Sequence, residues 1–211
     1  MIDAVRASKA AVYLWLGLAV LAAGCSQAGR PRGAGQHGGP PPLCLPGAAI
    51  VTTKESAVLQ RVFSRIYAAA QPDLGRLRVE AVVVRIPASS ALSADDGLSL
   101  CRASERATIT VSETRLARAL RGRTGELDLA RGIAHYLAHL AWNPTPTKVT
   151  AANHDVITHQ AEELGVYYFQ QAGYDCNRWE NPGQYLRHVR IACNLAKQGA
   201  RPHEPPAPAQ R

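Results

Sequence analysis

The sequence predicts a mainly helical α+β fold in which a small β-sheet packs against the helices. Apolar residues recur at spacings of three and four over several segments, which is typical of amphipathic helices. Two shorter runs are rich in β-branched residues, as strands are. Hydrophobic residues make up 46% of the chain and charged residues 19%, so the chain can bury a core. No internal repeat is visible, which excludes a solenoid.

The predicted elements follow one another as helix, strand, strand and four helices. The first helix covers 54–70, and the strands cover 77–86 and 107–111. Residues 88–104 are rich in Ser, Ala, Asp and Gly, so we expect a loop between the strands.

Four helices are predicted in the second half of the chain. Ser112 is the expected N-cap of the first, and Thr124 can cap the second. The prolines at 144 and 146 end the second helix, and Gly173 ends the third. The four helices cover 113–121, 126–142, 155–172 and 183–197.

The N-terminal segment has the pattern of an export signal. Arg6 and Lys9 precede an apolar run over 10–23. This run is shorter than the roughly 20 residues that a membrane-spanning helix needs. We therefore expect a signal peptide over 1–24 and no membrane-spanning anchor.

Cys25 follows in the sequence Leu-Ala-Ala-Gly-Cys, which resembles the lipobox of bacterial lipoproteins, although Ala22 stands where the pattern prefers Leu. The resemblance implies that Cys25 is acylated and becomes the new N-terminus, so that a lipid membrane is a partner. Ser26 in the next position implies the periplasmic face of the outer membrane of a Gram-negative bacterium. The alternative is an ordinary signal peptide followed by an incidental cysteine.

Composition divides the rest of the chain into three parts. Residues 25–47 hold the lipidated cysteine and a flexible tether, because Gly and Pro there prevent both helix propagation and strand pairing. Residues 48–198 form the expected folded domain, and 199–211 form an expected disordered tail.

The formal net charge of +8 raises the question of nucleic-acid binding. Aromatic residues make up 6% of the chain, and no block of consecutive Lys or Arg is present. We therefore expect no nucleic-acid partner, and we interpret the charge as solvated faces near an anionic membrane.

Four of the five cysteines remain when Cys25 is set aside, and an exported protein usually pairs them. Four cysteines allow three pairings. The predicted one joins Cys176 to Cys193 across a short loop between two helices and leaves Cys44 with Cys101. No Cys-x-x-Cys spacing is present, which argues against a cysteine-bound metal.

Two histidines on the helix over 126–142 are candidate metal ligands. His135 and His139 are four residues apart, so their imidazoles lie on one face of the helix. The alternative is a pair of polar residues on a half-exposed helix face, which is common.

Three stretches of the chain carry a family resemblance. They are Ala-Thr-Ile-Thr-Val-Ser-Glu-Thr-Arg-Leu from Ala107, Glu-Leu-Asp-Leu-Ala-Arg-Gly-Ile-Ala-His-Tyr-Leu-Ala-His from Glu126, and Gln-Ala-Glu-Glu-Leu-Gly-Val-Tyr-Tyr-Phe-Gln-Gln-Ala-Gly-Tyr-Asp from Gln160. Together they resemble the CAAX-protease/HtpX-like zinc metallopeptidases, gluzincins that include periplasmic lipoproteins. The resemblance covers roughly 50–195 and implies a gluzincin-like metallopeptidase domain.

The zinc motif of that family is degenerate here. His-Glu-x-x-His aligns with Arg131, Gly132 and His135, so only the last histidine is kept. The third ligand of the family, Glu, falls on Thr158, and its supporting Asp falls on Glu162. A catalytic zinc needs about three protein ligands, and a carboxylate must take the proton of its water. We therefore expect a vestigial site with no catalytic residue and no cofactor.

Arg131 is expected to find an acidic partner, because a cation in a cleft is costly when it is unpaired. The alignment makes Glu162 the best candidate. Asp128, three residues earlier on the same helix, is the alternative.

These observations predict a membrane-tethered periplasmic pseudopeptidase, a protein-binding or scaffolding lipoprotein of the cell envelope without proteolytic activity. Its partner would be another envelope protein. One alternative is an active metallopeptidase whose zinc is held by His135, His139 and a residue such as His159 or Glu162. A second alternative is a structural component of an envelope or secretion assembly that shares only the fold.

Overall fold

The structure is a computed structural model that describes residues 41, 43–45, 47–87, 98–142, 151–179 and 187–202, with the side chains of 151–157 left undescribed. The fold is α+β and mainly helical, as predicted. Its elements are β1 (Ala49–Ile50), α2 (Ser56–Leu74), β2 (Arg78–Arg85), β3 (Leu98–Ala103), β4 (Arg106–Ser112), α3 (Glu113–Arg121), α4 (Gly125–Trp142), α5 (Ala151–Gln171), the 3-10 turn η1 (Cys176–Arg178) and α6 (Arg187–Lys197). The predicted signal peptide, Cys25 and most of the tether lie outside the described residues.

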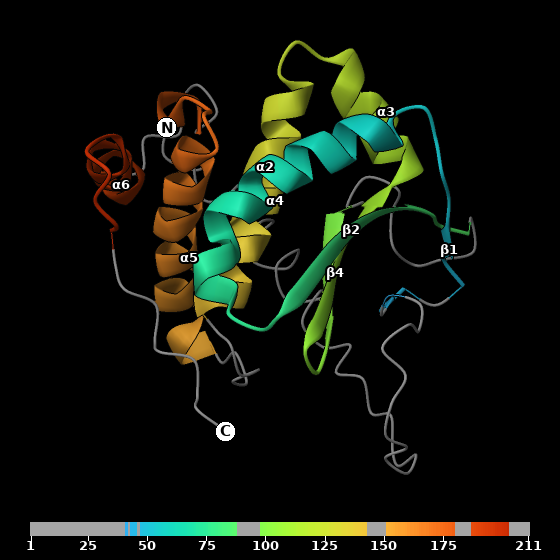
Figure 1. Cartoon of the computed structure of the whole chain (residues 1–211), viewed down its shortest axis with the longest axis horizontal. Coiled ribbons are helices and arrows are strands. Elements are labelled where there is room, and N and C mark those ends of the chain that lie inside the picture. The colour runs from blue at the N-terminus through green and yellow to red at the C-terminus, as the bar shows by residue number, and fades with distance from the viewer. Residues whose placement is uncertain are drawn as a thin grey trace, which may run out of the picture. The chain divides into compact units, whose positions relative to one another are not determined.

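The sheet has the strand order β1-β2-β4-β3. β2 and β4 are parallel, and β1 and β3 pair antiparallel with them at the two edges. The helices lie to one side of the sheet, and α6 is the farthest from it (Figure 1). No helix in the described part of the chain is long and apolar enough to cross a bilayer.

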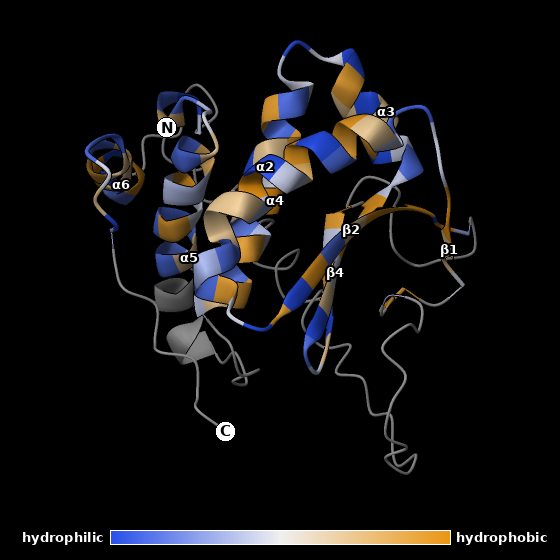
Figure 2. Ribbon diagram, in the orientation of Figure 1, coloured by the Kyte–Doolittle hydropathy of each residue, from blue (hydrophilic) through white to orange (hydrophobic). Residues whose placement is uncertain are grey.

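The core lies between the helices and the sheet face that they cover. Apolar and hydrophilic residues alternate along β2 and β4 and form stripes on the helices (Figure 2). Alternate strand residues and helix residues three or four apart therefore meet in one cluster. Its fully buried members include Leu59, Val62, Ile66, Ile109, Val111, Ile133, Leu137, Leu164 and Phe169.

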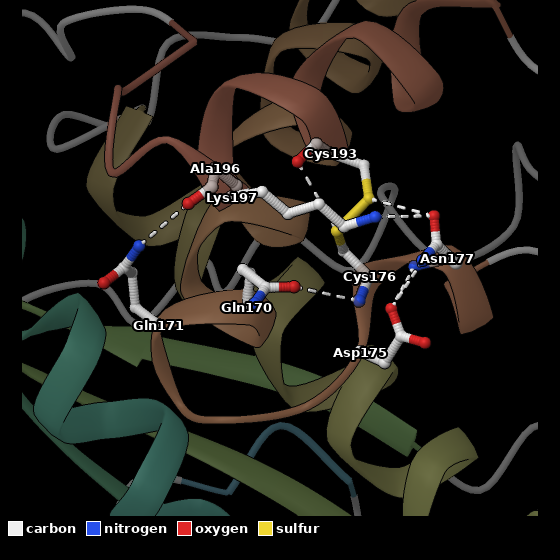
Figure 3. Close-up of a disulfide and its surroundings, with 8 residues drawn as sticks. All are labelled: Gln170, Gln171, Asp175, Cys176, Asn177, Cys193, Ala196 and Lys197. Atoms are coloured by element: carbon white, nitrogen blue, oxygen red, sulfur yellow. Dashed lines mark hydrogen bonds between the residues drawn. A yellow bond between two sulfur atoms is a disulfide. The ribbon is translucent and has the colours of Figure 1, made fainter.

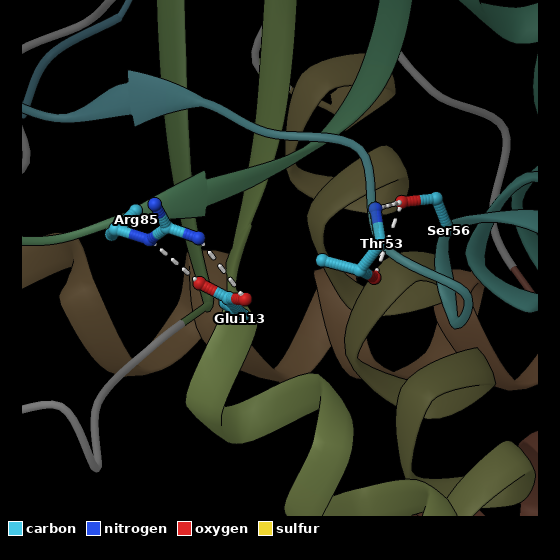
Figure 4. A network of polar contacts seen from close by, with 4 residues as sticks. All are labelled: Thr53, Ser56, Arg85 and Glu113. Atoms are coloured by element: carbon cyan, nitrogen blue, oxygen red, sulfur yellow. Dashed lines mark hydrogen bonds and ion pairs between the residues drawn. The ribbon is translucent and has the colours of Figure 1, made fainter.

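Polar contacts fix the beginnings of two helices (Figure 4). The Ser56 Oγ accepts a hydrogen bond of 2.9 Å from the Thr53 amide at the start of α2. The Arg85 guanidinium donates to the Glu113 carboxylate, with an Nε–Oε2 distance of 2.9 Å, which ties the end of β2 to the start of α3. The predicted N-cap of α3 is confirmed, because the Ser112 Oγ accepts from the Arg115 amide at 3.1 Å.

The expectation of a loop over 88–104 is wrong in its second half, because Leu98–Ala103 forms strand β3. This strand is stabilised by antiparallel pairing with β4, which follows it after a tight turn. Its alternation of Leu98 and Leu100 with Ser99 and Cys101 is short, and the surrounding small polar residues obscured it. The two-residue strand β1 was also not predicted.

Both predicted disulfides are present. Cys44 joins Cys101, which ties the segment before β1 to β3. Cys176 joins Cys193, which ties η1 to α6 (Figure 3). Beside the second bridge, the Asn177 Oδ1 accepts a hydrogen bond of 2.9 Å from the Lys197 Nζ.

The folded part extends beyond the expected boundary at residue 198. Arg201 donates hydrogen bonds of 2.5 and 2.6 Å to the two carboxylate oxygens of Asp73 at the end of α2. The Tyr168 hydroxyl donates to the same carboxylate at 2.7 Å. Burial and this bond raise the pKa of Tyr168. Arg201 therefore belongs to the folded part, and 203–211 lie outside the described residues.

Replacing Cys176 and Cys193 by serine should lower the free energy of unfolding by about 3 kcal/mol, because the bridge restricts the unfolded chain over a separation of 17 residues. Urea denaturation measures the loss. Each single variant should lose as much as the double variant, since either change opens the same bridge. An unchanged denaturation midpoint would contradict this prediction.

Candidate functional site

Helix α4 positions the residues that align with the zinc motif. Its first turn carries Glu126 and Asp128, where the helix dipole favours acidic side chains. Thr124 immediately precedes the helix, and its hydroxyl donates a hydrogen bond of 2.9 Å to the Asp128 carboxylate. Buried residues recur from Leu129 to Ala141, so α4 packs in the core along most of its length, and Arg131, Gly132 and His135 lie on this helix.

Leu98, the first residue of β3, lies against α4 at Gly132, the position that the resemblance aligns with the catalytic Glu. A Cβ atom built on Gly132 would lie 2.6 Å from the Leu98 Cδ2. The Tyr136 hydroxyl, one turn later, donates a hydrogen bond of 3.0 Å to the Leu98 carbonyl oxygen. The end of the Leu98 side chain therefore lies where a side chain at 132 would begin, and it would have to shift to admit a residue larger than glycine.

Arg131 stands at the position that the sequence resemblance assigns to the first zinc ligand, and its guanidinium donates hydrogen bonds to Asp128 and to the Arg178 carbonyl oxygen. Nη1 donates to the Asp128 Oδ1 at 2.8 Å, and Nη2 donates to the Arg178 carbonyl oxygen of η1. The Arg131 side chain is 17% exposed and that of Asp128 is 44% exposed. The alternative partner Asp128 is thus the one observed.

Glu162, the preferred partner by alignment, is instead engaged by α6. The His188 Nε2 donates to the Glu162 Oε2 at 2.7 Å. Helix α6 reaches α5 here because Cys193, one turn further along α6, is bonded to Cys176. Glu162 therefore pairs with His188 because of where α6 lies. The alignment of the zinc motif concerns α4 and α5 and could not predict this position of α6.

Two pairs of histidines lie on helices α4, α5 and α6. The His135 Nε2 and the His139 Nε2 are 3.1 Å apart, so one nitrogen donates to the other and at least one ring is neutral. The rings of His159 and His188 lie 4.5 Å apart between centroids. Burial lowers the pKa of His135, and the charge of Glu162 opposes this shift.

The residues at the vestigial site do not fit a catalytic zinc. Arg131 brings a fixed positive charge to one ligand position, and Thr158 offers a hydroxyl at another. Among the side chains that the structure describes, no group of three or more His, Cys, Asp or Glu is arranged to hold a metal ion. The alternative ligand set of His135, His139 and His159 is therefore not assembled as the side chains lie.

A groove with a volume of about 590 Å³ lies next to Gly132, between β3, β4, α3 and α4. Its apolar lining includes Leu98, Val111, Leu116 and Leu129. Its charged lining consists of Arg115, Arg118, Arg131 and Asp128. The groove thus begins where the zinc motif would lie and continues along the arginine-bearing side of α3.

The sequence interpretation missed the groove. Arg115 and Arg118 were treated as part of a solvated face, and Leu98 was assigned to a loop. The one available signal was the repetition of arginine at 115, 118 and 121, which lie along one side of a helix. That signal gives no information about the strand that forms the opposite wall.

Comparison with protein-family models, curated proteins and solved structures finds no match to this chain. The likeness to metallopeptidases therefore rests on the quoted sequence motifs.

Gly132→Glu should lower the free energy of unfolding by less than about 1 kcal/mol, because the end of the Leu98 side chain must shift to admit the new side chain, while glutamate gains over glycine in helix propensity. Combining it with Leu98→Ala should cost less than the sum of the two single losses, since the second change removes the overlapping atoms. Chemical denaturation of the four proteins measures this coupling. Strictly additive losses would show that the two residues do not interact as the structure has them.

Acid should destabilise the fold through His135. Its pKa is lower in the folded protein than in the unfolded chain, so the unfolded chain binds more protons between the two values. The free energy of unfolding should therefore fall as the pH decreases below about 6.5. Urea denaturation from pH 7.5 to 5 measures the slope, and His135→Gln should make it shallower. Equal slopes in the two proteins would contradict this assignment.

Proposed function

We propose that this protein is a non-catalytic binding protein of the bacterial cell envelope, built on a metallopeptidase-like frame. The observation that carries the proposal is the contact of Leu98 with Gly132. A general base at this position, where the family motif requires one, would have to displace the end of the Leu98 side chain. A groove lies beside this contact, so a surface for binding is present although the general base is absent.

The electrostatics at Arg131 support the same conclusion. Its guanidinium bridges α4 and η1 through Asp128 and the Arg178 carbonyl, so the former ligand position is occupied by a structural contact. A cation held there repels a divalent metal. Restoring a metal would require breaking this contact as well as supplying new ligands.

The groove has the properties of a polypeptide-binding surface. Apolar side chains line its interior and charged side chains lie beside them, a combination that gives both affinity and orientation. One wall is β3, which stands at the end of the strand order. Extended segments of a partner commonly bind beside such a strand through backbone hydrogen bonds.

The location of the protein is part of the proposal and rests on the sequence. Cys25 would carry the lipid, and the Gly- and Pro-rich residues up to 47 would tether the domain to the periplasmic face of the outer membrane. The bound partner would then be another protein of the envelope. A domain on such a tether can scaffold an assembly without entering the bilayer.

The protein, purified without chelator and without metal-affinity resin, should contain far less than one zinc per chain and should not cleave casein when zinc is added. Metal analysis and a casein assay measure this. The matched positive control is the variant Arg131→His, Gly132→Glu, Thr158→Glu with Leu98→Ala, which restores the ligands and the room for the base. It should bind zinc more tightly than the same variant that keeps Leu98.

Stoichiometric zinc or casein cleavage in the unmodified protein, abolished by His135→Ala, would overturn the proposal. That result would show an active metallopeptidase with a rearranged site that uses His135 and His139.

A further inference from the structure

Helix α6 has an outer face whose residues are all exposed. Successive residues of a helix are about 100° apart, so residues three, four and seven apart share one face. The Gln171 Nε2 of α5 donates a hydrogen bond of 3.2 Å to the Ala196 carbonyl oxygen, so the other side of α6 lies against α5. The exposed residues fall within an arc of about 120°. They are Arg187, Arg190, Ile191, Asn194, Lys197 and, just after the helix, Gln198.

The charges on this outer face are cations. The sequence of α6 contains no acidic residue. Arg187 and Arg190 are exposed, and neither forms a hydrogen bond or an ion pair in the part of the chain that the structure describes. The Lys197 Nζ donates to the amide oxygen of Asn177, a neutral acceptor that leaves the charge of the lysine in place. Two arginines of this face are therefore free to bind an anionic partner.

Ile191 adds one apolar side chain to the same face. It is 51% exposed, and in the described part of the chain only one other large hydrophobic residue, Ile50, is exposed. Helices that lie on a membrane combine basic residues with apolar ones that enter the headgroup layer. A protein interface usually has a core of several apolar residues and buries about 800 Å² on each partner. A single isoleucine between arginines therefore suits a lipid surface better than a protein.

The position of α6 allows this face to reach a membrane. The bridge between Cys176 and Cys193 ties α6 to η1. Helices α6 and α3 lie at opposite ends of the helical part of the fold (Figure 1), and α3 lines the groove. The proposed tether from Cys25 to Cys44 has about 19 residues, and a flexible chain of this length spans about 25 Å on average. A lipid on Cys25 would thus keep the domain close enough to the bilayer for contact.

We propose that the outer face of α6 lies on the anionic lipid surface to which the protein is tethered, an inference that rests on the lipid anchor of the proposed function. Arg187, Arg190 and Lys197 pair with lipid phosphates, and Ile191 enters the headgroup layer. The groove, which α3 lines at the other end of the helices, then lies away from the lipid and remains accessible to a partner protein.

Vesicle sedimentation tests this with the mature chain that carries Cys25→Ser, so that no lipid on the protein contributes to binding. The vesicles contain phosphatidylglycerol and phosphatidylcholine in equal parts, and vesicles of phosphatidylcholine alone are the neutral control. At about 0.1 M salt the protein should bind the anionic vesicles at least about tenfold more tightly, because each cation at the surface contributes to the affinity. Salt at about 0.5 M should remove most of this difference. Equal binding to both kinds of vesicle would overturn the proposal.

Two double variants locate the contact. Arg187→Gln with Arg190→Gln should weaken binding to the anionic vesicles by about tenfold. Arg121→Gln with Arg123→Gln is the matched control, because these exposed arginines at the end of α3 lie far from α6 and their loss changes the net charge equally (Figure 1). The control should weaken binding by less than about twofold, since charges more than about 10 Å from the surface are screened at this salt. Equal weakening by both variants would show that net charge alone drives binding and would overturn the proposal.

The mass of the N-terminal peptide from the native protein separates this proposal from the proposed function. If Cys25 is acylated but the vesicles bind without dependence on Arg187 and Arg190, the contact through α6 is wrong and the anchor of the proposed function stands. If Cys25 carries no lipid, the anchor fails, and vesicle binding that still depends on these two arginines supports the α6 contact by itself.

Discussion

The structure depends on the close packing of α4 against α5. Gly165 of α5 lies so near to α4 that a Cβ on it would be 3.4 Å from both the Ala134 carbonyl oxygen and the His135 Cα. The ring of Trp179 closes over the same point, with its Cη2 at 2.9 Å from that position. Ile133 and Leu137 are fully excluded from water on α4. Because this helix cannot rotate or slide without opening the core, the side chains on its remaining faces have fixed directions.

The site follows from that constraint. Because the position of α4 is fixed, Gly132 lies against Leu98 of β3, and the Arg131 guanidinium donates to the Arg178 carbonyl oxygen of η1. The Glu162 carboxylate accepts a hydrogen bond from His188 of α6. Arg115 and Arg118 of α3 line the groove beside Leu98 and Leu116. The packing of the helices thus brings arginine and leucine side chains together in one groove.

The ends of helices could be predicted where the interactions that define them join residues within one or two turns of each other. The N-cap at Ser112 and the extent of α3 follow from neighbours three residues apart, and the end of α5 follows from Gly173, whose φ of 82° suits glycine. Strand β3 was not predictable in the same way, since its stability comes from pairing with β4. Arg201 was assigned to a tail because its partner, Asp73, lies far away in the sequence.

The sequence by itself predicted the α+β class and the order of the longer elements, because these depend on residue type and local spacing, and it predicted the two disulfide pairings from the short loop between Cys176 and Cys193, which leaves Cys44 with Cys101. Only the tertiary structure decided which groups meet: Leu98 with Gly132, Arg131 with Asp128 rather than Glu162, and Glu162 with His188. The physical reason is that two of these contacts join residues of different elements. For Arg131, two acidic residues are equally suitable in charge, and their positions in the fold decide which one is bonded. The packing of α4, α5 and α6 makes that choice, and residue spacing along one helix does not encode it.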